Sequence, residues 1–147
     1  MFYAISGING DYEAYKRALK KLKFQNLDDI KEEDIMNEEA VISTLEGEDV
    51  LYVLGNIIGA GGGSMKILQD MMSRDNVIAV VGENEYKITQ ALKALNDHIQ
   101  STGEVPPQML VDKITSMLGE ELSGAVEEFL QLDDEEREDV IEYIDEI

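Results

Sequence analysis

The sequence predicts an α/β fold: a small parallel sheet of about three strands, flanked by helices and followed by an acidic helical C-terminal part. Two observations predict it. Three short apolar runs within the first 82 residues each stop at a glycine turn, and each is followed by apolar residues spaced three and four apart, which is typical of an amphipathic helix. After about residue 101 only the helical pattern continues.

The first strand-and-helix unit begins with the apolar run 2–5, which stops just before Gly7. Asp11 is placed to cap the helix that follows, because its side chain can accept a hydrogen bond from the first turn. The polar and acidic segment 25–48 is predicted to be a surface insertion, in which residues 40–45 could form a short helix.

Two further units follow this insertion. The run 50–54 ends in a glycine-rich loop at 59–63, and Ser64 is placed to cap the next helix. The run 77–81 is nearly all β-branched, which predicts a strand buried on both faces, and Gly82 ends it. Three strands alternating with helices predict parallel strands joined by right-handed crossovers.

The tail carries helical stripes only. Residues 133–136 place acid at a helix start, where the helix dipole favours it. Methionines at helical spacing, Met109 and Met117 among them, are expected in the core. We therefore expect an α/β core at residues 1–100, with an acidic helical part at 101–147 packed on it.

The chain is strongly acidic, with 32 acidic and 12 basic residues and a net charge of −20. Such a surface repels nucleic acid and anionic membranes, so we expect neither to bind directly. It would attract a protein with a basic surface, including a groove built for nucleic acid. The alternative is that the charge serves only solubility.

Other features indicate a cytoplasmic protein. Cysteine is absent, which excludes disulfides and thiolate metal sites and fits a reducing compartment. The first ten residues lack the basic and apolar regions of a signal peptide. No apolar stretch approaches the roughly 20 residues that span a bilayer.

Three strand-to-loop junctions carry a family resemblance: ISGING at 5–10, LGNIIGAG at 54–61 and VGENE at 81–85. Their order and spacing resemble the serine/threonine phosphoprotein phosphatases, a calcineurin-like metallophosphatase family with the motifs GDxHG, GDxxDRG and GNHE. The resemblance implies a bacterial or phage-type relative that lacks the family's C-terminal half. It would keep half of a two-sheet sandwich.

The same resemblance implies that catalysis is lost, because the family holds two metal ions with Asp, His and Asn ligands. The matching positions, including that of the phosphate-binding arginine, carry other residues: Gly7, Asn9, Asn56, Gly59, Ala60, Glu83 and Asn84. Glycine and alanine provide no ligand and asparagine only a neutral oxygen, so two divalent cations would lack anionic partners. We expect a pseudophosphatase without a cofactor and without a catalytic residue.

Two further site hypotheses concern the third junction and the glycine-rich loop. Glu83 and Glu85 could hold Mg²⁺ or Ca²⁺ with water, or could simply load a helix start with acid. The loop residues 61–64 could cradle an anion at a helix N-terminus, or their glycines could fill space and relieve strain. The residues concerned in the loop are Gly61, Gly62, Gly63 and Ser64.

Three functions are therefore open. The first is a non-catalytic protein that binds a basic protein partner through its acidic surface. A homodimer also fits, since a sheet face or edge must be covered by the chain's own helices or by a partner. The second is a phage-type inhibitor, such as an anti-CRISPR or nucleic-acid mimic, that blocks a basic channel. The third is a residual metal-dependent phosphoesterase.

Overall fold

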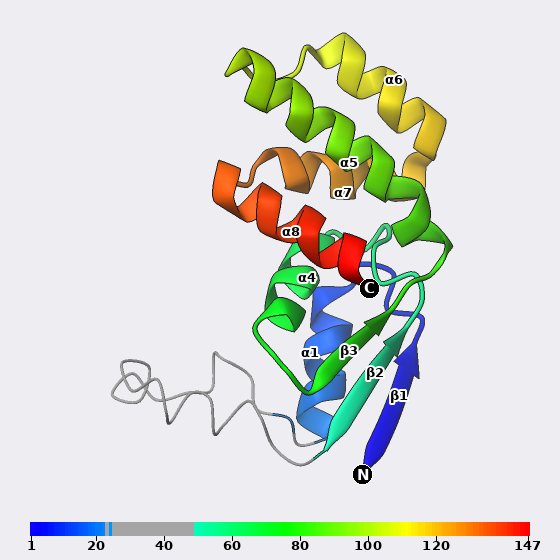
Figure 1. The fold of residues 1–147 in the computed structure, drawn as a ribbon. Coiled ribbons are helices and arrows are strands. Elements are labelled where there is room, and N and C mark those ends of the chain that lie inside the picture. The colour runs from blue at the N-terminus through cyan, green and yellow to red at the C-terminus, as the bar shows by residue number, and fades with distance from the viewer. Residues whose placement is uncertain (23, 25–48) are drawn as a thin grey trace.

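The computed structural model describes residues 1–22, 24 and 49–147. The predicted insertion at 25–48 and its short helix lie outside these residues. Figure 1 shows strands and helices in the following order: β1 (Phe2–Ser6), α1 (Tyr12–Lys21), β2 (Val50–Leu54), α4 (Ser64–Met72), β3 (Val77–Val80), α5 (Glu83–Thr102), α6 (Gln108–Leu118), α7 (Glu120–Leu130) and α8 (Asp134–Glu146).

The three strands form a parallel sheet in the order β1-β2-β3. The register places Ala4 beside Tyr52 and Tyr52 beside Ile78. The sequence prediction of an α/β fold with a parallel three-stranded sheet is therefore confirmed. Because the strands are parallel, the loops that follow β1, β2 and β3 all emerge at one end of the sheet.

Only one face of the sheet carries helices among the described residues. Both crossovers step in the same direction, and right-handed connections of that kind place their helices on the same side. The burial pattern agrees, since Val77 and Ala79 are buried while Ile78 and Val80 are exposed. The prediction that this strand is buried on both faces is therefore wrong, because α1 and α4 cover the same face.

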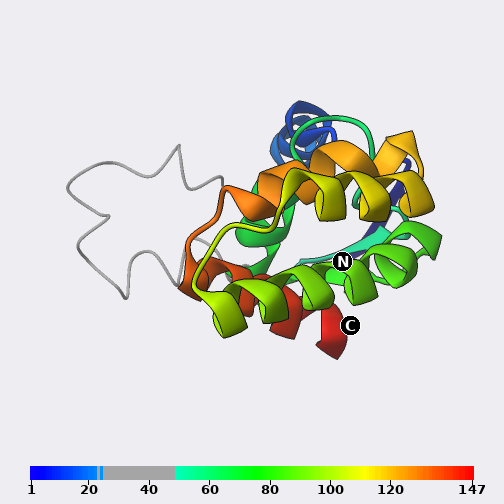
Figure 2. The same cartoon turned by 90° about the horizontal axis from the view of Figure 1, so that it is seen from above.

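The helices after β3 form a second layer. Figure 2 shows α5 beside α8 and α6 beside α7, and contacts join this group to α4 rather than to the open sheet face. α5 ends at Gly103, which adopts the left-handed conformation (φ 70°) that commonly terminates helices. Since α5 packs on α6, α7 and α8, the helical part begins spatially before residue 101.

Helix caps were partly predictable. Asp11 caps α1 by accepting the N–H of Ala14 at 3.0 Å, and Asp133 forms a capping box with Glu136 at the start of α8. Ser64, however, is the first residue of α4 and not its cap. Its hydroxyl instead bonds both the N–H and the carbonyl of Gly59, which closes the preceding loop.

The prediction for the methionines of α6 is also wrong. Met109 is 83% exposed and Met117 80% exposed. α6 packs mainly on α7, and the side chain it buries is that of Val111. A helix that contacts its neighbours along one narrow side leaves part of a wide apolar stripe in solvent.

Two buried arginines link elements of the structure. Arg74, which follows α4, pairs with Asp70 of that helix (2.7 Å), and Asp70 also accepts the hydroxyl of Tyr15 from α1 (2.6 Å). Arg137 of α8 donates to the side chain of Asn96 in α5 at 3.3 Å.

Among residues 1–22, 24 and 49–147, no helix combines the length and apolar character needed to cross a membrane.

Candidate functional site

The loops after β1 and β2 pack directly on each other at the carboxyl end of the sheet, the usual place for ligands in parallel sheets. Asn9 donates its backbone N–H to the carbonyl of Asn56 (3.0 Å), and Gly10 donates to the carbonyl of Ile57 (2.7 Å). Gly61 donates back to the carbonyl of Asn9 at 2.9 Å. The two loops therefore form a hydrogen-bonded unit that leaves little backbone available for a ligand.

Asn9 and Asn56 share an uncommon backbone conformation. Their φ angles are 47° and 43°, in the left-handed region that asparagine tolerates better than most residues other than glycine. Both residues stand at positions where the metallophosphatase motifs would place metal ligands. The geometry thus provides a conformational reason for asparagine at these two positions.

The third loop is joined to the second through asparagine side chains. Oδ1 of Asn56 accepts the backbone N–H of Asn84 at 3.1 Å, and so satisfies a free donor at the start of α5. The side-chain amide of Asn84 donates to the carbonyl of Ile58 at 2.9 Å. These polar side chains hold the loops together.

The remaining predicted positions do not add chemistry to this cluster. Gly7 is exposed with φ 73°, and Ala60 is exposed. Gly59 is a packing residue, because a Cβ there would lie 2.7 Å from the carbonyl oxygen of Asn9. The structure brings Asn9, Asn56 and Asn84 to one end of the sheet, where the backbone of Asn9 and the side chains of Asn56 and Asn84 bond to the protein itself.

Glu85 is the buried ionisable group of this region. Its Oε1 accepts the backbone N–H of Ile57 at 2.5 Å, while Oε2 is buried with no hydrogen-bond partner among the described residues. Burial raises the pKa of Glu85, and hydrogen bonds from surrounding backbone N–H groups, first that of Ile57, act in the opposite direction. The carboxyl group links the start of α5 to the loop after β2.

The raised pKa gives Glu85 a defined effect on stability. The folded protein holds a proton on this group more tightly than the unfolded chain, so the contribution of Glu85 is complete below its ordinary pKa of 4.5 and is lost as pH rises through the folded pKa. Glu85→Gln removes this titration. In urea titrations at a series of pH values, we expect the unfolding free energy of Glu85→Gln to increase relative to that of the wild type as pH rises above 4.5.

Glu83→Gln is the matched control, because Glu83 lies in the same helical turn but is exposed and paired with Lys87 (2.9 Å). The unfolding free energy of Glu83→Gln should change with pH in the same way as that of the wild type. The raised pKa of Glu85 would be contradicted if the difference in unfolding free energy between Glu85→Gln and the wild type stayed constant with pH. It would also be contradicted if raising the pH favoured the wild type.

The candidate metal pair is not brought together by the structure. Glu83 is directed to solvent and to Lys87, whereas Glu85 is buried against the loop after β2. Over residues 1–22, 24 and 49–147, no group of three or more His, Cys, Asp or Glu side chains is arranged to hold a metal ion.

The candidate anion loop is already hydrogen-bonded to the protein at several donors. Gly59 donates to Ser64, Gly61 to Asn9 and Gly63 to Gly10. Gly61 and Gly63 also pack closely on the first unit, because a Cβ on Gly61 would lie 2.5 Å from the backbone of Gly10, and one on Gly63 would lie 2.5 Å from Cβ of Tyr12 in α1. Gly62 is exposed with φ 81°, and a Cβ there would meet nothing. This geometry favours the space-filling role of the glycines.

A carboxylate of the chain itself lies at the start of α4, which was not predicted. Burial raises the pKa of Glu128 on α7, while hydrogen bonds from the backbone N–H groups of Met65 and Ser64 act in the opposite direction. Those N–H groups are the free donors of a helix N-terminus. No sequence signal could have identified Glu128, since about 63 residues separate it from its partners.

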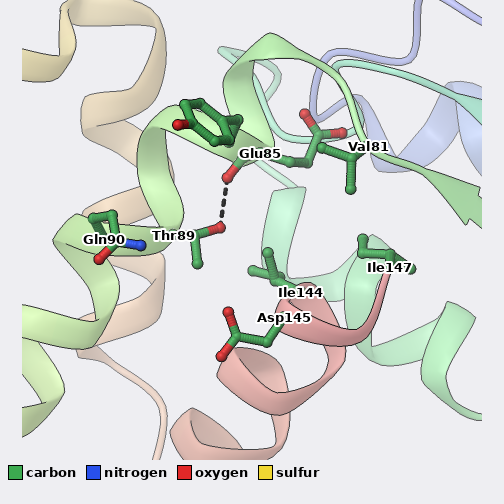
Figure 3. Close-up of a pocket in the computed structure, with 8 residues that line it drawn as sticks. Val81, Glu85, Thr89, Gln90, Ile144, Asp145 and Ile147 are labelled. Atoms are coloured by element: carbon green, nitrogen blue, oxygen red, sulfur yellow. Dashed lines mark hydrogen bonds between the residues drawn. The ribbon is translucent and has the colours of Figure 1, made fainter.

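A pocket of about 210 Å³ lies between the first turns of α5 and the end of α8 (Figure 3). The Glu85 carboxylate is directed toward the loop after β2 and away from Ile144 and Asp145. On the pocket side its backbone carbonyl accepts the hydroxyl of Thr89 at 2.6 Å. Asp145 is paired with Lys93 at 2.7 Å. Thr89 and Asp145, two polar residues of this pocket, are thus engaged in contacts within or between helices.

Comparisons with protein-family models, with curated proteins and with solved structures find no match to this chain. The resemblance to the metallophosphatases therefore stays a prediction that rests on the three junctions. The fold and the geometry of the loops are the basis for the functional proposal.

Proposed function

We propose that this protein is a non-catalytic binding protein, a degenerate metallophosphatase relative that attaches to a basic protein surface through its acidic helices. The observation that carries the proposal is the exposed side of α8. It presents carboxylates at spacings of three and four residues, which follow one another along the helix: Glu135, Glu138, Asp139, Glu142 and Glu146.

This arrangement costs stability within the helix. Like charges four residues apart, such as Glu138 and Glu142, repel each other by a few tenths of a kcal/mol per pair. The arginine that α8 contains does not relieve this repulsion, because Arg137 is buried and its ion pair is with Asp134, outside the row of five, while its other contacts are Asn96 and the carbonyl of Leu132. Within residues 101–147, all of which the structure describes, Lys113 is the one exposed cation.

The loop geometry supports a role without chemistry. The side chains of Asn56, Asn84 and Glu85 each bond to backbone groups of neighbouring loops, where they stabilise the junctions. A general acid or base must reach a substrate, and these contacts direct the groups inward.

A second candidate function uses the same surface. A row of carboxylates about 5–6 Å apart along one helix face presents a linear negative charge. Basic nucleic-acid channels bind linear negative charge through their lysines and arginines. The protein would then act as an inhibitor of the anti-CRISPR or nucleic-acid-mimic kind, with its partner's channel as the target.

The test compares two variants of equal charge. In the first, Glu135, Glu138 and Glu142 are changed to glutamine. In the control, three exposed acids outside α8 are neutralised: Glu13, Asp97 and Glu104. We expect the tagged wild type and the control to retain basic proteins from a lysate at about 0.1 M salt, and the α8 variant to lose most of them.

The recovered partner also separates the two candidates. A nucleic-acid-binding partner that releases labelled duplex DNA when this protein is added would favour the inhibitor. Partners that are acidic or neutral, that persist at about 1 M salt, or that bind the α8 variant equally well would contradict both candidates.

The phosphoesterase alternative is tested separately by calorimetry with Mn²⁺ and Mg²⁺. The family's ligand positions carry glycine and asparagine, apart from Glu83, which is exposed and paired with Lys87. We therefore expect no saturable binding at micromolar metal. Stoichiometric heat that disappears in an Asn56→Ala variant would restore a metal-dependent function.

A further inference from the structure

Asn9, in the loop after β1, is the one asparagine of this sequence that is followed by glycine. An asparagine before glycine is prone to deamidation, because glycine has no side chain to hinder attack of its backbone nitrogen on the asparagine side chain. Asn9 is also exposed, so that water can reach it. The Asn9–Gly10 pair therefore meets the chemical requirements of this reaction.

The reaction needs water and no other reagent. The backbone nitrogen of Gly10 gives up its proton to water or hydroxide and attacks Cγ of Asn9. The bond between Cγ and Nδ2 breaks, ammonia leaves and a succinimide ring remains. Water then opens the ring at Cγ, which gives aspartate, or at the main-chain carbonyl of residue 9, which gives isoaspartate. Either product carries one more negative charge than asparagine.

The folded protein holds the attacking nitrogen in a hydrogen bond. The N–H of Gly10 donates to the carbonyl of Ile57 at 2.7 Å, so its proton is shielded from a base in solution. The neighbouring carbonyls are bonded too, since Asn9 accepts the N–H of Gly61 at 2.9 Å and Gly10 accepts that of Gly63 at 2.8 Å. The loops after β1 and β2 must therefore separate before the nitrogen can attack.

The closed loops have no room for the isoaspartate product. Isoaspartate continues the main chain through Cβ and Cγ, and so adds one carbon to the backbone between residues 9 and 10. A Cβ on Gly59 would already lie 2.7 Å from the carbonyl oxygen of Asn9, and one on Gly61 would lie 2.5 Å from the carbonyl carbon of Gly10. An additional backbone carbon would therefore displace Asn9 from its hydrogen bonds with Asn56 and Gly61.

We propose that Asn9 is a site of spontaneous deamidation, which the packing of the first two loops suppresses, and whose isoaspartate product keeps these loops apart. The change runs in one direction, because the released ammonia is lost to solvent. It alters the carboxyl end of the sheet and does not depend on the function proposed for α8.

Peptide mapping by mass spectrometry tests the site. The folded chain and the same chain in guanidinium chloride are incubated at mildly alkaline pH. We expect deamidation at Asn9 to be slower in the folded chain by at least about tenfold, the factor that an opening free energy of 1.4 kcal/mol gives. Asn56 is the control within the chain. It has the same left-handed conformation (φ 43°) but precedes isoleucine, so it should stay unmodified over the same period.

Two outcomes of this experiment would overturn the proposal. Equal rates at Asn9 in the folded and the unfolded chain would show that loop packing does not suppress the reaction. Deamidation that begins at another asparagine of the unfolded chain would show that Asn9 is not the preferred site.

Gly61→Ala tests the link to loop packing, because the added Cβ would push Gly10 out of its hydrogen bonds. We expect the rate at Asn9 in this variant to approach that of the unfolded chain. Gly124→Ala, whose Cβ would meet no atom within 4 Å, should keep the wild-type rate. Amide hydrogen exchange of Gly10 in the wild type measures loop opening without a variant. An amide of Gly10 that exchanges as fast as in the unfolded chain would overturn the proposal.

Hydrogen exchange of the purified products tests the effect of isoaspartate. In the isoaspartate form, we expect fast exchange at Gly61 and Gly63, whose N–H groups bond to residues 9 and 10 in the closed loops. Asn9→Asp is the matched control, because aspartate also tolerates the left-handed conformation and should keep this exchange slow. Slow exchange at both glycines in the isoaspartate form would contradict separation of the loops.

Discussion

Asp70→Ala should lower the free energy of unfolding by about 3–5 kcal/mol, because it removes the carboxylate paired with a buried arginine. The side chain of Arg74 is fully buried and that of Asp70 is 10% exposed, with 2.7 Å between Nε and Oδ2. Taking away one member of a buried ion pair leaves the other charge out of water without that partner. Urea denaturation monitored by circular dichroism measures the loss.

Tyr15→Phe is the control for this prediction. Its hydroxyl donates to the same carboxylate at 2.6 Å, and burial raises the pKa of Tyr15, so the group stays a neutral donor. Loss of one hydrogen bond to a charged group costs about 1.5–3 kcal/mol. If Asp70→Ala and Tyr15→Phe lowered the free energy of unfolding equally, the ion pair with Asp70 would not be what stabilises the buried charge of Arg74.

Gly82→Ala should destabilise the protein by about 3 kcal/mol or more, at the upper end of what overpacking costs. A Cβ on Gly82 would overlap the backbone nitrogen of Asn56 and lie 2.7 Å from Cα of Gly55. These are backbone atoms at the junction of β2 and its loop, so no side-chain rotation can relieve the clash. The substitution would separate the loops that Asn56 and Asn84 join.

Gly124→Ala is the matched control for this clash. Gly124 lies within α7, and a Cβ there would meet no atom within 4 Å. Alanine is favoured over glycine in a helix by about 1 kcal/mol, so this variant should gain stability. Urea denaturation of both variants gives the comparison, and a Gly82→Ala protein as stable as wild type would contradict the close packing of the loops.

Much of the fold could be predicted because its causes are local. The strands were found from apolar runs of four or five residues, and the helices from periodicity within single elements. The cap at Asp11 was predicted, and at Asp133 only an acidic helix start was expected. In both cases the cause is local, because each side chain bonds a backbone N–H three residues away. The parallel sheet followed from the alternation of strands and helices.

The position of the candidate site in the fold was predictable, but the contacts that its residues make were less so. The three junctions do converge at the carboxyl end of the sheet, since parallel strands end together. The sequence did not show that Asn9 and Asn56 adopt left-handed conformations, or that Glu85 reaches Ile57. These features depend on how separate loops pack against one another.

By itself, the sequence determined the strands, the helices and the parallel order of the sheet, because these depend on residue spacing and on neighbours within a few positions. It also determined the excess of negative charge in the tail. Only the tertiary structure decided that one sheet face carries no helix among the described residues, that Met109 and Met117 lie in solvent and that Glu128 reaches the start of α4. The physical reason is that each of these results from contacts between segments far apart in the chain, which local patterns do not encode.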